Sequence, residues 1–155
     1  YTTQAEIKRL NRRSEQALHD CEFLAVLSGR EQRDRLSRVW KSTLLQQFHD
    51  ILPGSSIERV NREARHRMTA NLDTVEELAS ESLSALFGKE PDIPERFVVV
   101  NTLSWERHEL VSIPWSGSEP AVVRSESGIA VPVQREPGTL LVPLKLPRWG
   151  TQRLP

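Results

Sequence analysis

The prolines of this chain are gathered in its second part. Of 10 prolines in 155 residues, only Pro53 lies before residue 90. Because proline lacks the amide N–H and has a fixed φ, it is excluded from helix interiors. The distribution therefore predicts an α+β fold. We expect a three-helix antiparallel bundle over residues 1–90 and a small antiparallel β-sandwich-like unit over residues 91–155.

Apolar residues recur at helical spacing along three stretches of the first part. The first helix is expected to begin behind Thr2 or Thr3 as N-cap and to stop at Gly29. The third begins with a capping box in which Ser55 is followed by Glu58, and it ends at Gly88. Short connections favour an antiparallel bundle. The three stripes are Ile7, Leu10, Ala17, Cys21 and Leu24, then Leu36, Val39, Trp40, Leu44 and Phe48, then Ile57, Val60, Ala64, Met68, Leu72, Val75, Ala79, Leu83 and Leu86.

Short β-branched runs separated by turn residues fill the second part. The runs "RFVVVNTL", "HELVSIPW", "AVVRSES", "IAVPVQ" and "TLLVPLKL" predict about five antiparallel strands. The consecutive apolar residues of "FVVVNTLSW" are typical of a strand covered on both faces. Exposed strand edges invite pairing, so we expect the β unit to continue into, or pack against, further sequence. The opening "YTTQAEIKRL" is how a piece of a longer protein would begin.

Charge and cysteine content exclude several classes of function. The 21 basic residues balance the 21 acidic residues, which argues against nucleic acid and acidic membranes as partners. The basic run around Arg12 is interleaved with polar residues and predicts a solvated helix face.

Cys21 is the only cysteine, so an internal disulfide and a cysteine-based zinc site are excluded. Its place on an apolar stripe predicts a buried side chain. No apolar run approaches membrane-spanning length, and no signal-peptide pattern opens the chain.

Most residues that could carry chemistry have a simpler interpretation. Three histidines lack a nearby histidine partner or lie among arginines, and they are interpreted as surface residues: His19, His66 and His108. Three glutamates share a helix face rather than facing each other across a cleft, as a glycosidase pair must: Glu76, Glu77 and Glu81. Three tryptophans of the β part could stack on sugar rings but are more often core or interface residues: Trp105, Trp115 and Trp149.

The stretch "QFHDILPGSS" is the exception, because His49 and Asp50 lie together at a helix break. Phe48 continues the apolar stripe, so the imidazole of His49 is expected at the margin of the buried face. The negative end of the helix dipole favours a bound cation there. Pro53 stops the helix, and the following glycine permits a sharp turn. Such a pair supplies at most two ligands, whereas zinc takes four, or three plus water; a metal site and a plain helix end both stay open on the residues alone.

The segment "LLQQFHDILPGSSI" resembles the one that opens the middle domain of family 38 glycoside hydrolases, the α-mannosidases, and is close to their bacterial and cytosolic branch. The upstream "YTTQAEIKRLNRRSEQAL" is similar to the family's link out of its catalytic barrel, and "FVVVNTLSWERHELVSIP" to its first strands after the helical domain. The resemblance implies that His49 is a ligand of a divalent metal, usually Zn²⁺, and that Asp50 helps to hold the sugar. It also implies retaining hydrolysis of terminal α-mannosides in the cytoplasm.

The chain departs from that family because it has no barrel. The resemblance then places the nucleophile, the acid/base and the other three metal ligands before Tyr1, so no catalytic residue is expected in this chain. We expect the isolated chain to bind zinc weakly and to hydrolyse nothing. The expected partners are the α-mannoside and the enzyme's own N-terminal barrel, and a homo-oligomer stays open. The alternative is a non-catalytic helical/β scaffold or a carbohydrate-binding interaction module.

Overall fold

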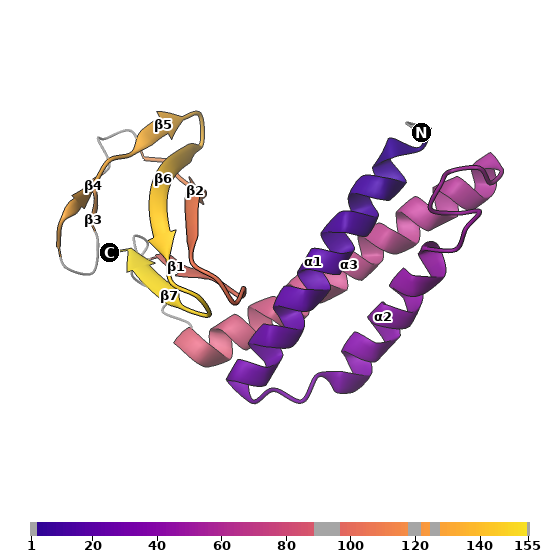
Figure 1. Cartoon of the computed structure of the whole chain (residues 1–155), viewed down its shortest axis with the longest axis horizontal. Coiled ribbons are helices and arrows are strands. Elements are labelled where there is room, and N and C mark those ends of the chain that lie inside the picture. The colour runs from indigo at the N-terminus through magenta and orange to yellow at the C-terminus, as the bar shows by residue number, and fades with distance from the viewer. Residues whose placement is uncertain (1–2, 89–96, 118–121, 125–127, 155) are drawn as a thin grey trace. The chain divides into compact units, whose positions relative to one another are not determined.

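The computed structural model describes residues 3–88, 97–117, 122–124 and 128–154. The chain divides into two compact units, residues 1–89 and 90–155. Three helices form the first unit and small antiparallel sheets form the second (Figure 1), so the predicted α+β class is confirmed. Among the described helices, none is long and apolar enough to cross a membrane.

The helical unit is an up-down-up bundle in which consecutive helices run in opposite directions (Figure 1). Its helices are α1 (Ala5–Ser28), α2 (Arg33–Gln46) and α3 (Glu58–Phe87). The expected stops are confirmed. Gly29 caps α1 in a left-handed conformation, with its N–H directed at the carbonyls of Ala25 and Val26, and the N–H of Gly88 bonds to the carbonyl of Ser84.

The helices bury their apolar stripes in two clusters. One joins all three helices and contains the fully buried Leu18, Cys21 and Leu78. The other joins α1 and α3 around Ile7 and Met68, and the connection between α2 and α3 packs against it. The predicted burial of Cys21 is confirmed.

Charged and polar side chains tie the helices together at the edges of these clusters. Arg35 of α2 reaches two carboxylates of α3 at 2.9 Å each, those of Glu77 and Glu81. Gln32 donates to the carbonyl of Leu78 at 3.1 Å. Two of the three glutamates interpreted as a solvated face, Glu77 and Glu81, therefore also connect α3 to α2, because α2 presents an arginine within reach.

Three expectations about the helices are wrong. The N-cap residues are Gln4 for α1 and Ile57 for α3, and neither side chain makes a capping hydrogen bond. Thr3 and Ser55 are therefore not the N-caps that the sequence predicts. Thr2 lies outside the described residues. Leu44 and Phe48 are exposed by 55% and 50%. Leu44 lies off the buried face of α2, which consists of Leu36, Val39, Thr43 and Gln46, and the helix ends before Phe48.

The second unit contains seven strands among the described residues, more than the five expected. They are β1 (Phe97–Val100), β2 (Arg107–Pro114), β3 (Val123–Arg124), β4 (Ala130–Val131), β5 (Gln134–Glu136), β6 (Thr139–Leu146) and β7 (Thr151–Leu154). They pair as β1–β7, β2–β6–β5 and β3–β4, and every pair is antiparallel. The excess arises because "IAVPVQ" spans β4 and the start of β5, and because β7 lies outside the five runs. One apolar cluster serves all three sheets, with Ile113, Val142 and Leu154 buried in it.

A buried amide fixes the loops at one end of this unit. The side chain of Asn101 donates to the carbonyls of Trp105 and Pro147 at 2.8 and 2.9 Å, and its oxygen accepts the N–H of Leu103 at 3.1 Å. The expectation of two covered faces is wrong for "FVVVNTLSW", since Val98 of β1 is exposed. Trp115 packs against the core as expected, but Trp105 and Trp149 are exposed by 59% and 58%.

Candidate functional site

The segment that carries His49 and Asp50 is a compact series of turns between α2 and α3. The helix ends at Gln46, and the N–H groups of Ile51 and Leu52 both bond to the carbonyl of Phe48, at 2.8 and 3.0 Å. Gly54 follows Pro53 with φ at 82°, a left-handed conformation that glycine adopts without strain. The predicted break is therefore present, but Pro53 does not stop the helix, which ends seven residues earlier at Gln46.

His49 and Asp50 project from this connection together. The imidazole Nε2 lies 3.5 Å from Asp50 Oδ2, and the two side chains are exposed by 77% and 61%. The ring of Phe48 lies 4.2 Å from the imidazole, centroid to centroid, and is tilted by 44°. The expected position at the margin of the buried face is wrong for His49, because the chain turns away from the helix axis before residue 48.

The pair fits a divalent metal in chemistry but not in number. An imidazole nitrogen and a carboxylate oxygen are ordinary zinc donors, and a zinc site needs three or four protein ligands. Within the described parts of the chain, no group of three or more His, Cys, Asp or Glu side chains is arranged to hold a metal ion. His49 and Asp50 could therefore contribute to such a site only together with ligands from elsewhere.

Apolar and polar contacts fix the connection on its C-terminal side. Ile51 and Leu52 pack against the cluster of Ile7 and Met68. Lys8 of α1 donates from Nζ to the carbonyl of Pro53 at 3.0 Å. Ser56 Oγ donates to the carbonyl of Asp50. No local pattern in the sequence marks Lys8, since its partner lies 45 residues along the chain.

Four large apolar side chains are exposed near the pair in the sequence, and one of them, Phe48, contacts the imidazole of His49. Leu44, Leu45, Phe48 and Ile57 are all at least half exposed, and they belong to the end of α2 and to the connection that carries His49. We refer to these four residues as the apolar rim. Large exposed apolar patches mark interaction sites, especially where polar residues border them.

The other histidines lie apart from this pair, as expected. His19 is exposed and lies 3.2 Å from Asp20, and His108 is exposed and lies 3.2 Å from Glu106. His66 is exposed on α3. None of the three lies in a cluster of metal-binding side chains among the described residues.

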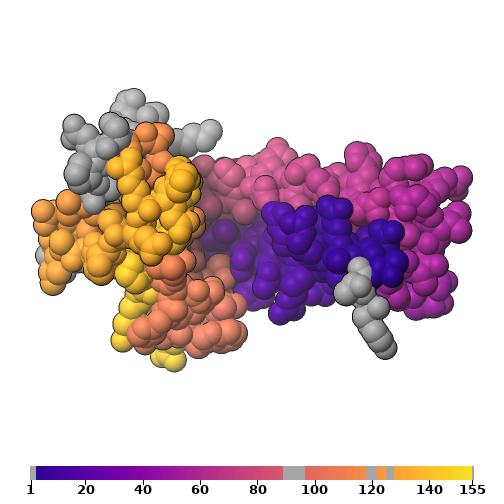
Figure 2. All heavy atoms as spheres, turned by 90° about the horizontal axis from the view of Figure 1, so that it is seen from above, coloured from indigo at the N-terminus to yellow at the C-terminus, as the bar shows by residue number. Residues whose placement is uncertain are grey.

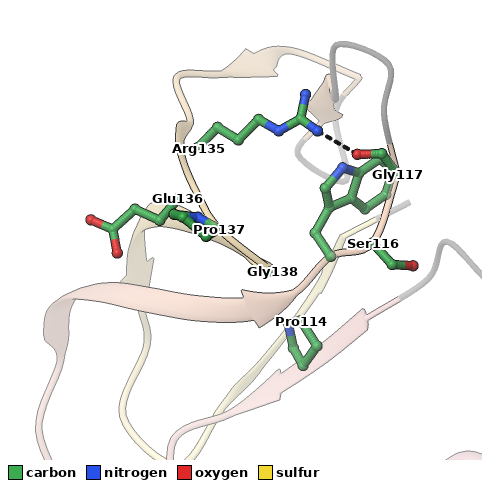
Figure 3. A pocket seen from close by; sticks show the side chains of 8 residues that line it. Pro114, Ser116, Gly117, Arg135, Glu136, Pro137 and Gly138 are labelled. Carbon is green, nitrogen blue, oxygen red and sulfur yellow. Dashed lines mark hydrogen bonds between the residues drawn. The ribbon is translucent and has the colours of Figure 1, made fainter.

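A hollow of about 650 Å³ in the β unit has different chemistry (Figure 3). It lies between the β5–β6 hairpin and the end of β2, and Arg135 donates across it to the carbonyl of Gly117. Glycoside hydrolysis normally needs two carboxyl groups. Glu136 is the only carboxylate among the described residues that line the hollow, so these residues cannot form such a pair.

Comparison with known proteins relates the chain to α-mannosidases. The family model of the α-mannosidase middle domain matches residues 1–86. The chain is 37% identical to human α-mannosidase 2C1 over 76% of the chain, and 34% identical to the α-mannosidase of Saccharomyces cerevisiae over 72%. It spans only 12% and 11% of the lengths of these two relatives.

Solved structures show the same fold. The crystal structure of an α-mannosidase from Enterococcus faecalis V583 matches 97% of this chain with a TM-score of 0.68. The sequence identity is 18%, and the match covers 23% of the bacterial chain. The helical and β units therefore both have counterparts in a solved protein of much greater length.

Proposed function

The chain belongs to the α-mannosidase middle-domain family of glycoside hydrolase family 38, and from this membership we propose that it works as the helical and early β part of a longer retaining α-mannosidase. The proposed reaction is hydrolysis of terminal α-mannosides. The observation that carries the proposal is the exposed His49–Asp50 pair, 3.5 Å apart, in a segment matched by the family model.

In this proposal His49 is one ligand of a Zn²⁺ ion and Asp50 binds a mannose hydroxyl. The metal would supply a Lewis acid that binds sugar hydroxyls. The two side chains are exposed while their backbone is anchored through Ile51, Leu52 and Pro53. An anchored backbone helps to hold a pair of ligands in the required geometry.

The nucleophile, the acid/base and the remaining metal ligands are proposed to come from an N-terminal catalytic barrel of the same enzyme, outside this chain. The apolar rim supports this partner, because four large exposed apolar side chains at the end of α2 and in the connection are suited to burial against another domain. The chain's small share of its relatives' length supports it too. We further propose that the enzyme is cytoplasmic, like the branch that the motif resembles.

Assays of the longer enzyme and of this chain test the proposal. The longer enzyme should hydrolyse an aryl α-mannoside with retention at the anomeric carbon, followed by NMR of the first-formed product. His49→Ala should abolish turnover without changing the helical circular dichroism, whereas His66→Ala, at an exposed position of α3, should not affect it. Full activity of His49→Ala would refute the assignment.

The isolated chain should be inactive and should bind zinc weakly in a calorimetric titration, since it supplies at most two of the ligands. Tight binding of one zinc ion per chain, or turnover of the aryl mannoside, would contradict this part of the proposal. Chelator-treated longer enzyme should lose activity and regain it with added metal.

A second candidate, a mannoside-binding module without catalysis, rests on Trp105 and Trp149. Both indoles are exposed on loops that Asn101 holds together, and exposed aromatic rings can stack on sugars. Affinity electrophoresis in a mannan gel distinguishes this candidate. Retardation that is lost in Trp105→Ala and Trp149→Ala would favour it, and unchanged mobility of the parent chain would exclude it.

A further inference from the structure

A stripe of polar residues on α1 faces the segment that carries His49. Lys8, Asn11 and Glu15 are three and four residues apart, which places them on one face of the helix. Asn11 is buried, and Glu15 is partly buried. Figure 2 shows the N-terminal end of α1, in indigo, against the magenta surface of the connection between α2 and α3. This polar stripe contacts the connection at both of its ends.

The first contact of the connection is made by Gln47, the residue after α2. Its Nε2 donates to Asn11 Oδ1 at 3.1 Å and to Glu15 Oε1 at 3.0 Å. Asn11 Nδ2 donates in turn to the same Glu15 oxygen, at 3.2 Å. Three side chains thus form a closed triangle of hydrogen bonds, in which one acceptor is a carboxylate and the bonds are correspondingly strong.

Two anchors hold the connection on either side of His49 and Asp50, and only a few residues lie between them. Gln47 is bonded to α1, and Ile51 and Leu52 are packed in the core; Lys8 bonds to Pro53 beyond them. His49 and Asp50 lie on the three-residue bridge 48–50 between these anchors. Because the side chains of His49 and Asp50 are themselves exposed, the position of the imidazole depends on where the anchors hold the backbone.

We propose that Gln47 is a positioning residue for His49, and that the triangle with Asn11 and Glu15 sets the place of the imidazole for metal binding. This inference rests on the proposed function. With a carboxylate at position 15, the triangle requires a donor at position 47, and the amide of Gln47 supplies it. A carboxylate at position 47 would lie about 3 Å from the carboxylate of Glu15, and like charges at that distance repel.

The decisive experiment uses four variants of the longer enzyme. Gln47→Ala removes the donor, and Gln47→Glu replaces it with a charge of the same shape. The double variant Gln47→Glu with Glu15→Gln restores the triangle with its polarity reversed, because Asn11 can turn its amide over. Gln16→Ala is the matched control, since Gln16 is exposed on the same helix.

The first measurement needs neither metal nor turnover. Hydrogen–deuterium exchange of the metal-free protein should be faster over residues 47–52 in Gln47→Ala and Gln47→Glu than in the parent. Exchange in α3 should stay unchanged, and both the double variant and Gln16→Ala should match the parent. Unchanged exchange over residues 47–52 in both single variants would overturn the proposal.

The second measurement separates positioning from a merely structural role. Changes to groups that orient a metal ligand typically cost about 10–100-fold in activity or metal affinity, so kcat should fall by about that factor in both single variants, with a smaller change in KM. The double variant should recover most of kcat. A kcat unchanged in both single variants, or one that recovers when the assay temperature is lowered well below each variant's Tm, would overturn the proposal.

The His49→Ala variant separates the two claims. If it is inactive while the Gln47 variants keep the parent's kcat, the role of Gln47 is refuted and the proposed function stands. If it is fully active, the proposed function fails, and the role assigned to Gln47 fails with it.

Discussion

Gly54 lies so close to Gln4 that position 54 has no room for a side chain: a Cβ added there would lie 2.7 Å from Gln4 Cβ. The same added atom would lie 2.9 Å from the carbonyl oxygen of Thr3. Gln4 itself has a positive φ of 55°, and its side chain accepts a hydrogen bond from Arg65 of α3. The turn after Pro53 and the start of α1 therefore depend on each other.

We predict that Gly54→Ala destabilises the helical unit more than Gly29→Ala does. Both glycines have positive φ, which costs an alanine roughly 1–2 kcal/mol. Only Gly54 adds a steric conflict, and overpacking typically costs about 1–3 kcal/mol more. Urea unfolding followed by circular dichroism measures both variants, and equal losses would show that the contact with Gln4 relaxes freely.

Truncation of Leu78 should destabilise the helical unit much more than truncation of Leu44. Leu78 is fully buried between the helices, whereas Leu44 is 55% exposed. Leu78→Ala should lower the free energy of unfolding by about 2–5 kcal/mol, and Leu44→Ala should change it by about 0.5 kcal/mol or less. Chemical denaturation of this chain provides the comparison; a large loss in Leu44→Ala would mean that α2 packs differently from the described arrangement.

Cys21 should be unreactive until the bundle opens. Burial, together with the neighbouring carboxylates of Glu22 and Glu81, raises the pKa of its thiol to about 11. Since the thiolate is the reacting form, a colorimetric disulfide reagent at pH 8 should label the folded chain very slowly. Labelling should become fast and stoichiometric in denaturant, and rapid labelling of the native chain would contradict the burial.

Glu81 should make the stability of the bundle depend on pH. The hydrogen bond from Arg35 holds the pKa of Glu81 below its ordinary value of 4.5, despite the opposing effect of burial. A carboxyl with a lowered folded-state pKa stabilises the fold above its unfolded pKa, and that contribution is lost as the pH falls through the folded pKa. Stability should thus decrease on acidification below about pH 4.5.

The Glu81→Gln variant isolates this effect. It should be less stable than the parent at pH 7 and should lose less stability on acidification. Glu63→Gln is the control, because Glu63 forms only an exposed pair with Arg59. Thermal unfolding between pH 7 and pH 3 tests the pair of variants, and parallel curves for Glu81→Gln and the parent would refute the prediction.

Local patterns in the sequence were sufficient to predict the helices but not their ends. The spacing of residues such as Met68 and Leu72 gave the right helix faces, and Gly29 and Gly88 gave the right stops, because these signals act within one or two turns. Ser55 looked like a cap, yet α3 begins three residues later at Glu58. An N-cap depends on backbone angles that the neighbouring turn decides, and here Gly54 sets that turn.

The candidate site was predictable only in part for a similar reason. His49 and Asp50 could be selected from the motif around them, but the triangle of Gln47, Asn11 and Glu15 joins residues more than thirty positions apart. No periodicity encodes such pairs. The exposure of Leu44 and Phe48 was not predicted either, because the sequence pattern of an apolar residue that packs in the core is the same as that of one that contacts a partner domain.

Because of the polar stripe on α1, folding should be sensitive to insertions and deletions between Lys8 and Glu15, although exposed positions in this stretch should tolerate substitutions. Each residue turns an α-helix by about 100°, so deleting one exposed residue between Lys8 and Glu15 would rotate one contact away while leaving the other in place. The part of α1 from Lys8 to Glu15 therefore has a fixed rotational position relative to the bridge that carries His49. Libraries that vary residue identity at Arg9, Arg12 or Arg13 should yield many folded members, and libraries that vary the length of this stretch should yield almost none.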